Sequence, residues 1–412
     1  MSSAKHQLIK LAIDGNEANV KNRVGSNVYA FEILKALEQL TYRQRNIKVT
    51  VLLSEPKAVD LPKVRRGWHY EVITPAKFWT QLALPAYLFQ NQAKFDLFYT
   101  PGHYAPRHCP IPYVSSVMDL AYLKYPHQFT KKDYLQLKNW TSYSVKQAVK
   151  VITISQFSKN EIVSLYHRLA EDVVVAYPAV SPAPKITPLQ AKLVKRKLKV
   201  SDHYLLFVGT IQPRKNLLRL IEAFEQLCLF LDQEHFHEHN VSTRRGRKSR
   251  LSIYQDLQLV IAGQIGWLAK EIIERVKASP FKDKIVLTGF VSEKAKQVLI
   301  NQAETLALVG FYEGFGIPPL EAMQHQVIPV VAKTSSLREV VGSAGIMVDP
   351  ESVDSITLGL KEVLSLSTKQ RAILLRQARD QLKKFSWTQS AQTILHTLEE
   401  IFYDQRLIRT KS

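Results

Sequence analysis

The segment Tyr312-Glu313-Gly314-Phe315-Gly316-Ile317-Pro318-Pro319-Leu320-Glu321-Ala322 combines a glycine-bracketed turn, a Pro-Pro pair and two carboxylates. It follows the apolar run 305–309. Proline favours the start of a helix, because its missing N–H would be unbonded there anyway. Glycine permits backbone angles and a close ligand approach that a side chain would block. We therefore expect a strand, a tight turn and a helix start, with Glu313 before the turn and Glu321 inside the first helical turn.

This segment offers two kinds of group to a ligand. Carboxylates accept hydrogen bonds from sugar hydroxyls, while the free backbone N–H groups and the dipole of a helix start favour anionic oxygens. A ligand that carries both hydroxyls and phosphates would use both. The alternative is a plain helix start, in which the early Glu only complements the helix dipole.

Short apolar runs of strand length alternate with helical patterns along the chain, which favours a parallel sheet of the α/β kind. Helices are expected over 26–40 and 216–231, where apolar residues recur near helical spacing. The predicted strands are 8–14, 48–53, 70–73, 97–99, 112–117, 151–154, 173–175, 204–208, 257–262, 285–288, 305–309 and 327–331.

Residues 178–188 contain four prolines in eleven positions and predict a stiff connector that is hostile to helix. We place the domain boundary there, with an N-terminal domain over 1–180 and a C-terminal domain over 181–385. A final helical segment covers 386–412, and Ser386 is suited to cap it. The expected fold class is α/β, with two Rossmann-like doubly wound domains facing each other across a cleft. Ligands of such sheets bind beyond the carboxyl ends of the strands.

Two motifs point to a known family. The spacing Glu-x7-Glu with the interior Gly-Phe-Gly-x-Pro-x-Leu resembles the donor-site signature of the retaining nucleotide-sugar glycosyltransferases of family 4. The segment Gly209-Thr210-Ile211-Gln212-Pro213-Arg214-Lys215-Asn216 resembles a second motif, in a mannosyltransferase-like branch of that family. The resemblance implies the GT-B architecture, with an acceptor domain over 1–180 and a nucleotide-sugar donor domain over 181–385. It also implies that the final segment crosses back onto the first domain.

The resemblance assigns a role to each matching residue. Glu313 would orient the transferred sugar, and Glu321 would accept hydrogen bonds from the ribose hydroxyls. Arg214 and Lys215 would neutralise the diphosphate, on which charge accumulates in the transition state. A solvated basic turn is the alternative for these two cations. The remaining expected donor-binding residues are Gly209, Thr210, Gly263, Gly314, Phe315 and Gly316.

The first domain carries a candidate loop of its own. Gly25-Ser26-Asn27 resembles the family's glycine-containing loop before the first helix, where a helix N-terminus would face the donor phosphates or the acceptor. Because Ser and Asn are ordinary helix caps, a simple capped helix start is the alternative.

Two departures from the family pattern affect the expected chemistry. Met118 stands before Asp119, where relatives usually carry His, and a thioether cannot donate a hydrogen bond. We hypothesise that His103 or Asp119 takes over part of this catalytic role. The second departure is Gln324-His325-Gln326, where relatives usually place small residues and Gly.

The formal charge of +20 and the pI near 9.7 call for anionic partners. Nucleic acid, an anionic membrane surface and anionic small substrates would each account for it, as would a generally basic proteome. The resemblance favours a nucleotide-sugar donor, a glycan or lipid-linked acceptor and an anionic membrane surface. No specific nucleic acid, no metal and no cofactor are expected.

The remaining features concern the compartment and one unusual segment. Cys109 and Cys228 give neither metal spacing nor a disulfide framework. The N-terminus does not resemble a signal peptide, and no stretch approaches the roughly 20 apolar residues that span a bilayer. We expect a cytoplasmic protein, peripheral on the inner face of the membrane. Residues 233–256 are expected as a polar surface insertion, since their three alternating histidines lack a metal-binding helix spacing or a cysteine partner.

Together these features predict a hexosyltransferase. It would move a hexose, with mannose as the first guess, from a nucleoside diphosphate sugar to a glycan or lipid-linked acceptor hydroxyl with retained configuration. The alternative, supported by Met118, is a catalytically impaired scaffold that binds membranes or nucleic acid through its basic surface. An enzyme similar to the α-glucan phosphorylases shares the architecture, but no motif in this sequence supports it.

Overall fold

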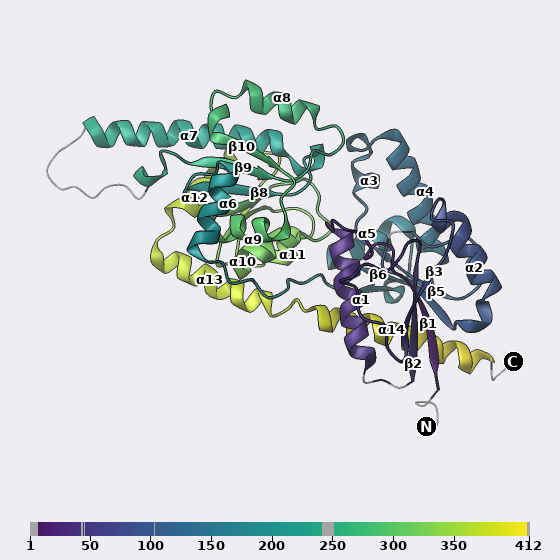
Figure 1. Ribbon diagram of the computed structural model, residues 1–412. Helices are drawn as coiled ribbons and strands as arrows, with labels where there is room; N and C mark the ends of the chain where they lie inside the picture. The colour runs from purple at the N-terminus through teal and green to yellow at the C-terminus, as the bar shows by residue number, and fades with distance from the viewer. Residues whose placement is uncertain (1–6, 43, 45, 103, 241–250, 410–412) are drawn as a thin grey trace. The chain divides into compact units, whose positions relative to one another are not determined.

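The computed structural model describes residues 7–42, 44, 46–102, 104–240 and 251–409 (Figure 1). The chain divides into two compact units. Unit 1 consists of Met1–Lys124, Lys131–Ala179 and Phe385–Ser412. Unit 2 consists of Tyr125–Thr130 and Val180–Lys384. The six residues 125–130, which we expected in the first domain, therefore pack with the second.

Unit 1 is built on a seven-stranded parallel sheet in the order β3-β2-β1-β4-β5-β6-β7. Its central strands are buried on both faces, which is why they appear in the sequence as continuous apolar runs. The strands are β1 (Ile9–Asp14), β2 (Ile47–Leu53), β3 (Trp68–Val72), β4 (Leu97–Thr100), β5 (Tyr113–Val117), β6 (Lys150–Thr153) and β7 (Val173–Val175). Each predicted strand of this unit is confirmed to within about two residues.

The helices of unit 1 flank this sheet (Figure 1). They are α1 (Ser26–Tyr42), α2 (Leu84–Gln90), α3 (Ala121–Lys124), α4 (Lys131–Gln147), α5 (Gln156–Tyr166) and α14 (Trp387–Arg409). The last helix packs against α1, with the ring of Trp387 edge-on to that of Tyr29 at 5.9 Å. Ser390 on α14 also donates to the carbonyl of Tyr177 at 2.5 Å. These contacts attach the C-terminal helix to unit 1.

Unit 2 repeats the same sheet plan with six parallel strands in the order β10-β9-β8-β11-β12-β13. The strand order reverses between β8 and β11, and doubly wound sheets bind ligands at such a point. The strands are β8 (Tyr204–Val208), β9 (Gln258–Ala262), β10 (Ile285–Gly289), β11 (Thr305–Leu308), β12 (Pro329–Ala332) and β13 (Ile346–Val348). We did not predict β13, whose three residues form too short an apolar run to stand out.

Helices cover both faces of this second sheet, with α7 against α12 and α9 against α10 (Figure 1). They are α6 (Pro188–Leu198), α7 (Leu217–Asn240), α8 (Lys270–Ala278), α9 (Glu293–Gln302), α10 (Ile317–Gln324), α11 (Leu337–Val341), α12 (Val353–Ser365) and α13 (Thr368–Leu382).

Helix α7 corrects one expectation. It continues to Asn240, nine residues beyond the predicted end at 231, because nothing in 232–240 breaks a helix. The first part of the predicted insertion is thus helical, and no strand carries its histidines. Residues 241–250, and the side chains of 236–240, lie outside the described residues.

Cys109 and Cys228 are both free cysteines. Within the described residues, no helix is long and apolar enough to cross a membrane. In that same part of the chain, no group of three or more His, Cys, Asp or Glu side chains is placed to hold a metal ion.

Candidate functional site

The predicted donor residues meet at the switch point of the unit 2 sheet. Strand β8 leads into the loop 209–216, and its neighbour β11 leads into the loop 309–316. A backbone hydrogen bond from Phe311 N to the carbonyl of Arg214, 3.0 Å long, ties the two loops together. Residues that are almost a hundred positions apart in the sequence therefore share one edge of the sheet.

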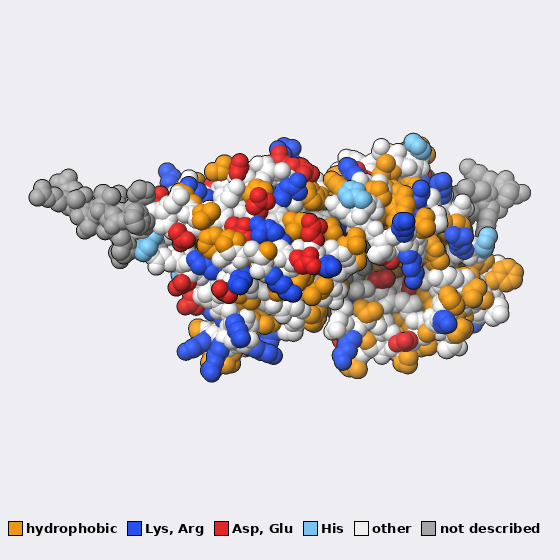
Figure 2. Space-filling view, turned by 90° about the horizontal axis from the view of Figure 1, so that it is seen from above, with side chains coloured by type: hydrophobic (Ala, Val, Ile, Leu, Met, Phe, Trp, Pro, Cys, Tyr) orange, Lys and Arg blue, Asp and Glu red, His pale blue; other side chains and the backbone are white. Residues whose placement is uncertain are grey.

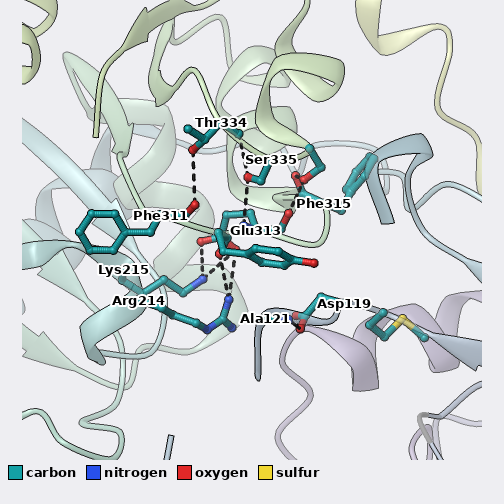
Figure 3. A network of polar contacts seen from close by, with 12 residues as sticks. Asp119, Ala121, Arg214, Lys215, Phe311, Glu313, Phe315, Thr334 and Ser335 are labelled. Atoms are coloured by element: carbon teal, nitrogen blue, oxygen red, sulfur yellow. Dashed lines mark hydrogen bonds and ion pairs between the residues drawn. The ribbon is translucent and has the colours of Figure 1, made fainter. Parts of the chain in front are cut away.

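An ion pair lies at the centre of this site (Figure 3). The ammonium of Lys215 donates to both carboxylate oxygens of Glu313, at 2.6 and 2.9 Å. Both residues are buried, with 9% and 6% exposure. The guanidinium of Arg214 lies 3.8 Å from the same carboxylate and donates to the carbonyl of Tyr312 at 3.2 Å. The two cations thus pair with Glu313 and orient its carboxylate. We had expected them to contact the diphosphate.

Two serines that we did not predict hold the Glu313 turn (Figure 3). Glu313 N donates to Ser335 Oγ at 3.1 Å. Ser336 Oγ lies 2.7 Å from the carbonyl oxygen of Glu313 and 2.9 Å from that of Phe315. Both serines follow β12, the next strand of the sheet. No local sequence signal marked them, because their partners are more than twenty positions away.

Glycine is required at two predicted positions of this edge. A Cβ on Gly263, whose φ is +158°, would lie 1.9 Å from the carbonyl oxygen of Gly209, so the loops after β8 and β9 pack directly on each other. Gly316 has φ +101°, and a Cβ there would lie 2.6 Å from Leu337 Cδ2. Thr210 lies in the first of these packed loops and is half-buried. Gly314 and Phe315, by contrast, are buried.

Asn216, the residue before α7, joins two loops of the site through its side chain. Its side-chain amide donates to the carbonyls of Val309, at 3.0 Å, and Pro350, at 2.7 Å. Its backbone is left-handed, with φ +57°, and ends the short turn Pro213–Lys215. Asn tolerates this conformation better than most residues. Asn216 therefore fixes the exit of the cation loop against the loop after β11.

Glu321 lies farther along its helix than we predicted. It is the fifth residue of α10, in the second turn rather than the first, because the helix begins at Ile317, one residue before the Pro-Pro pair. It projects toward α9, where Lys296 Nζ and Gln297 Nε2 approach Glu321 Oε1 at 2.7 and 2.9 Å. The other oxygen, Oε2, is buried and has no hydrogen-bond partner among the described residues. The two oxygens of this carboxylate thus differ, because the protein bonds only to Oε1 among the described residues.

Burial and mutual attraction both shift the pKa values of Glu321 and Lys296. Burial raises the pKa of Glu321, and the attraction of Lys296 opposes that rise. Burial acts in the opposite direction on Lys296, but the attraction of Glu321 and Glu293 outweighs it and raises the lysine pKa. We did not predict Lys296 or Gln297, since they lie on a helix more than twenty positions from Glu321.

The unusual Gln324-His325-Gln326 segment is part of the same network. His325 Nε2 lies 2.6 Å from Gln297 Oε1, and Gln297 in turn donates to Glu321. Burial lowers the pKa of His325, which favours the neutral ring. Gln326 occupies a left-handed position with φ +62°. A Gly in relatives would adopt this conformation without strain.

The predicted loop of unit 1 is engaged within its own unit. Asn27 Nδ2 and Ser26 Oγ donate to the carboxylate of Glu17, at 2.5 and 3.4 Å. Gly25 has φ +52° and precedes helix α1. The side chains of Ser26 and Asn27 are thus engaged with a carboxylate of their own unit rather than with the N–H groups of α1.

Asp119, which we expected to take over part of the catalytic role of the missing His, also lies in unit 1. Asp119 Oδ1 accepts from Ala121 N at 3.1 Å and so caps the short helix α3. Met118 is buried, with 5% exposure, so its side chain belongs to the core of the unit. His103 lies outside the described residues.

The segment 125–130 packs on two loops of the unit 2 edge. Trp267 Nε1 donates to the carbonyl of Gln128 at 2.8 Å, and the Trp267 ring lies 5.8 Å from that of Phe129. The ring of Tyr125 lies 6.2 Å from that of Tyr312, next to Glu313. The loop after β9, which we expected near the nucleotide, therefore holds this segment.

Comparison with known proteins identifies the family. Residues 190–381 match the family Glycosyl transferases group 1, and residues 24–183 match Glycosyltransferase Family 4. The chain belongs to glycosyltransferase family 4. It is a glycosyltransferase that transfers hexose units, and its two doubly wound units form the GT-B fold.

The similar characterised proteins are named as mannosyltransferases. The chain is 28% identical over 294 residues to O-antigen chain mannosyltransferase B of Escherichia coli, covering 71% of both chains. It is 26% identical over 251 residues to the serotype-specific mannosyltransferase WbdA of Escherichia coli, but this match spans only 28% of that longer protein. It is also 27% identical over 197 residues to alpha-1,3/1,6-mannosyltransferase ALG2 of Kluyveromyces lactis, covering 46% of this chain and 39% of that protein.

Solved structures support the fold. The sucrose-phosphate synthase of Thermosynechococcus elongatus matches with a TM-score of 0.69 at 14% identity, covering 96% of this chain and all of the other. The Anabaena protein HepE, solved with UDP-glucose, matches with a TM-score of 0.66 at 18% identity over the same shares. At these identities the likeness concerns the fold alone.

Proposed function

We propose that this protein transfers mannose from GDP-mannose to a hydroxyl of a glycan or lipid-linked acceptor, with retention of configuration. The observation that carries the proposal is the buried cluster of Arg214, Lys215 and Glu313 at the switch point of the unit 2 sheet. The names of the relatives, which are mannosyltransferases, support mannose as the sugar.

The cluster supports a front-face reaction. The bond from the sugar C1 to the diphosphate breaks as the acceptor oxygen forms its bond to C1 on the same face. The acceptor proton passes to an oxygen of the departing diphosphate. Arg214 and Lys215 would stabilise the charge that develops on that group. Glu313 would accept from the hydroxyls of the sugar, and the free oxygen of Glu321 from the ribose.

We further propose that the reaction needs no divalent metal, because the two fixed cations supply the charge stabilisation. Incubation with GDP-mannose and mannosyl oligosaccharide acceptors, with and without EDTA, tests this. We expect an α-linked product by NMR at a rate that EDTA does not change. A rate that depends on added Mg²⁺ or Mn²⁺ would contradict the metal-free mechanism.

Thermal shifts across GDP, UDP and ADP test the choice of donor. A ligand present at 100 times its Kd stabilises the native state by about 2.7 kcal/mol. We expect the largest shift with GDP. If no nucleoside diphosphate shifts the melting temperature while nucleic acid binds with strong salt dependence, the impaired scaffold suggested by Met118 becomes the better proposal.

We also propose that the protein works in the cytoplasm, peripherally attached to an anionic membrane surface. Helix α6 supports this, since it exposes Leu189 and Leu193, 66% and 55% accessible, beside the exposed cations Lys192, Arg196 and Lys197. Exposed leucines beside lysine and arginine suit the headgroup region of a bilayer. Figure 2 shows Lys and Arg side chains gathered at one border of unit 2, while both signs mix over the rest of the visible face.

Sedimentation with vesicles tests this attachment. We expect binding to phosphatidylcholine vesicles that contain phosphatidylglycerol, and none to phosphatidylcholine alone. The double change Leu189→Ser and Leu193→Ser should weaken this binding, whereas Leu358→Ser, at an equally exposed leucine of α12, should not. Equal binding of both variants would exclude α6 as the attachment surface.

A further inference from the structure

A pocket of about 430 Å³ lies at the carboxyl ends of β1, β2 and β3 in unit 1. Its volume is within the range of small-ligand sites. The residues that line it come from the loops after these three strands and belong to unit 1 alone. They are Asn16, Asn19, Val20, Ser54, Glu55, Ala76, Phe78, Trp79, Thr80 and Gln81. None of them was predicted as a site residue.

Two asparagines hold the wall of the pocket in place. Asn16 Oδ1 accepts from the backbone N and the hydroxyl of Ser54, at 2.7 and 3.0 Å. Asn19 Oδ1 accepts from Ala58 N at 2.7 Å, while its amide donates to the carbonyl of Pro56 at 3.1 Å. These bonds tie the loop after β1 to the loop after β2, so the pocket is formed before any ligand arrives.

Other polar groups of the lining are uncommitted. The carboxylate of Glu55, the hydroxyl of Thr80 and the side-chain amide of Gln81 form no hydrogen bond or ion pair within the described part of the chain. Glu55 and Gln81 are also exposed. The pocket thus presents a carboxylate, a hydroxyl and an amide that are free to bind a ligand.

Two aromatic residues complete the lining. Phe78 is 57% exposed, and its backbone is left-handed with φ +56°, a conformation that bulky residues rarely adopt. Lys77, which does not line the pocket, holds its ammonium 5.4 Å from the ring centroid. Trp79 is 4% exposed, and its indole N–H has no hydrogen-bond partner among the described residues. A buried indole N–H usually has one.

The charge of the lining selects among ligand classes. The chain carries a formal charge of +20, yet no Lys, Arg or His lines this pocket, and its charged side chain is Glu55. A phosphate, a nucleotide or an anionic headgroup would be repelled by that carboxylate. A neutral ligand with several hydroxyls would satisfy the carboxylate, the amide and the hydroxyl, while its C–H face packs on an aromatic ring.

We propose that this pocket binds a terminal pyranose of the glycan acceptor, with Glu55 accepting from its hydroxyls and Phe78 packing on its ring. The assignment of this sugar as the acceptor rests on the proposed function. The pocket recognises the acceptor through neutral hydroxyls, in contrast to the cationic cluster of unit 2.

Ligand-observed NMR titration of the full chain with methyl α-D-mannopyranoside and with an α-linked mannobiose tests the pocket. We expect Glu55→Gln and Phe78→Ala each to weaken binding about tenfold, which is about 1.4 kcal/mol. Phe78→Tyr should restore binding, because it keeps the ring. Phe89→Ala is the matched control, since Phe89 is 66% exposed in the same unit but does not line the pocket.

The outcomes separate this inference from the proposed function. Sugar binding that is equal in the parent, Glu55→Gln and Phe78→Ala chains, or undetectable in the parent, would overturn the pocket assignment. Thermal shifts with GDP on the parent chain report separately on the donor site. If GDP fails to bind while the sugars bind and respond to both changes, the proposed transfer reaction fails and the sugar pocket stands.

Discussion

The two sheets share one strand order but treat buried carboxylates in opposite ways at their carboxyl edges. In unit 2, Glu313 is paired with Lys215, and Glu321 with Lys296. In unit 1, Asp14 is also buried but forms no ion pair among the described residues; it is 3.0 Å from Asn16 N and 3.5 Å from the Thr100 hydroxyl. Burial raises its pKa to about 7.

This difference in how the buried carboxylates are paired suits the carboxyl edges of the two sheets to different kinds of ligand. In unit 2, a lysine pairs with each of the two buried carboxylates, at the edge where we propose that a diphosphate binds. The edge of unit 1 carries Asp14, whose pKa of about 7 lies close to neutral pH. Beside it is a pocket whose lining contains no Lys, Arg or His. One fold plan therefore supports an edge suited to anions and an edge suited to neutral hydroxyls.

The largest effect is expected when the lysine that pairs with Glu313 is removed, which tests whether the unit 2 edge depends on its ion pairs. Lys215→Met leaves a buried carboxylate without its close partner, which costs about 3–5 kcal/mol in the free energy of unfolding. Without the lysine charge that would face the diphosphate, transfer should slow by about 10²–10³-fold. Urea unfolding and steady-state kinetics measure the two effects.

The double change Lys215→Met with Glu313→Gln is the control for this prediction. It should recover most of the stability and none of the activity, since no buried charge remains but both functional groups are lost. If Lys215→Met alone is as stable as the parent, Glu313 does not depend on its lysine.

The next prediction concerns Asp14 of unit 1, where the carboxyl group itself is replaced by a neutral amide. A carboxyl group whose folded pKa is raised stabilises the fold below its unfolded pKa, and this contribution is lost as the pH rises through about 7. Asp14→Asn keeps a neutral group at every pH. We expect the variant to gain up to about 4 kcal/mol over the parent as the pH rises from 4 to 8, measured by urea unfolding.

Asp60→Asn is the matched control for this pH dependence. The hydrogen bond from Arg23 lowers the pKa of Asp60, so its stabilising contribution is present at neutral pH and lost as the solution is acidified. This variant should therefore lose a little stability above pH 4 rather than gain it. Equal pH profiles for Asp14→Asn and the parent would show that Asp14 is charged at neutral pH.

A smaller effect is expected at the second pair of unit 2. Lys296→Met removes the cation from Glu321, and burial then favours the protonated carboxyl group, which is a poorer acceptor for ribose hydroxyls. We expect GDP to bind about tenfold more weakly, by calorimetry at pH 7.5. Lys294→Met, at an exposed lysine of the same helix, should leave the affinity unchanged. Equal losses in both variants would point to overall charge instead.

The smallest expected effect concerns the backbone after α10. Gln326→Gly should stabilise the protein by about 1 kcal/mol, because the left-handed φ of +62° carries no strain in glycine. Gln326→Ala removes the side chain beyond Cβ but keeps the Cβ, so it should give no such gain. Thermal unfolding compares the three proteins, and a gain in both variants would assign the effect to the side chain.

Sequence reasoning predicted the two loops that meet at the candidate donor site but not the residues that orient them. Glu313, Arg214 and Lys215 were recognisable because turn chemistry and spacing are local properties. Ser336 and Lys296 were not, since each acts on a partner far away in the chain. Helix α10 was predicted, but it begins at Ile317, one residue before the Pro-Pro pair, so Glu321 is its fifth residue rather than part of its first turn.

The sequence alone determined the two α/β series, their boundary region and the family. Apolar periodicity, glycine turns and the proline-rich connector act over a few residues and need no tertiary contact. Only the tertiary structure decided which charges meet. The parallel ladder β8–β11 brings Lys215 onto Glu313 across 98 positions. In unit 1, the sheet buries Asp14 with no ion-pair partner among the described residues. No local sequence pattern records what lies across a sheet edge.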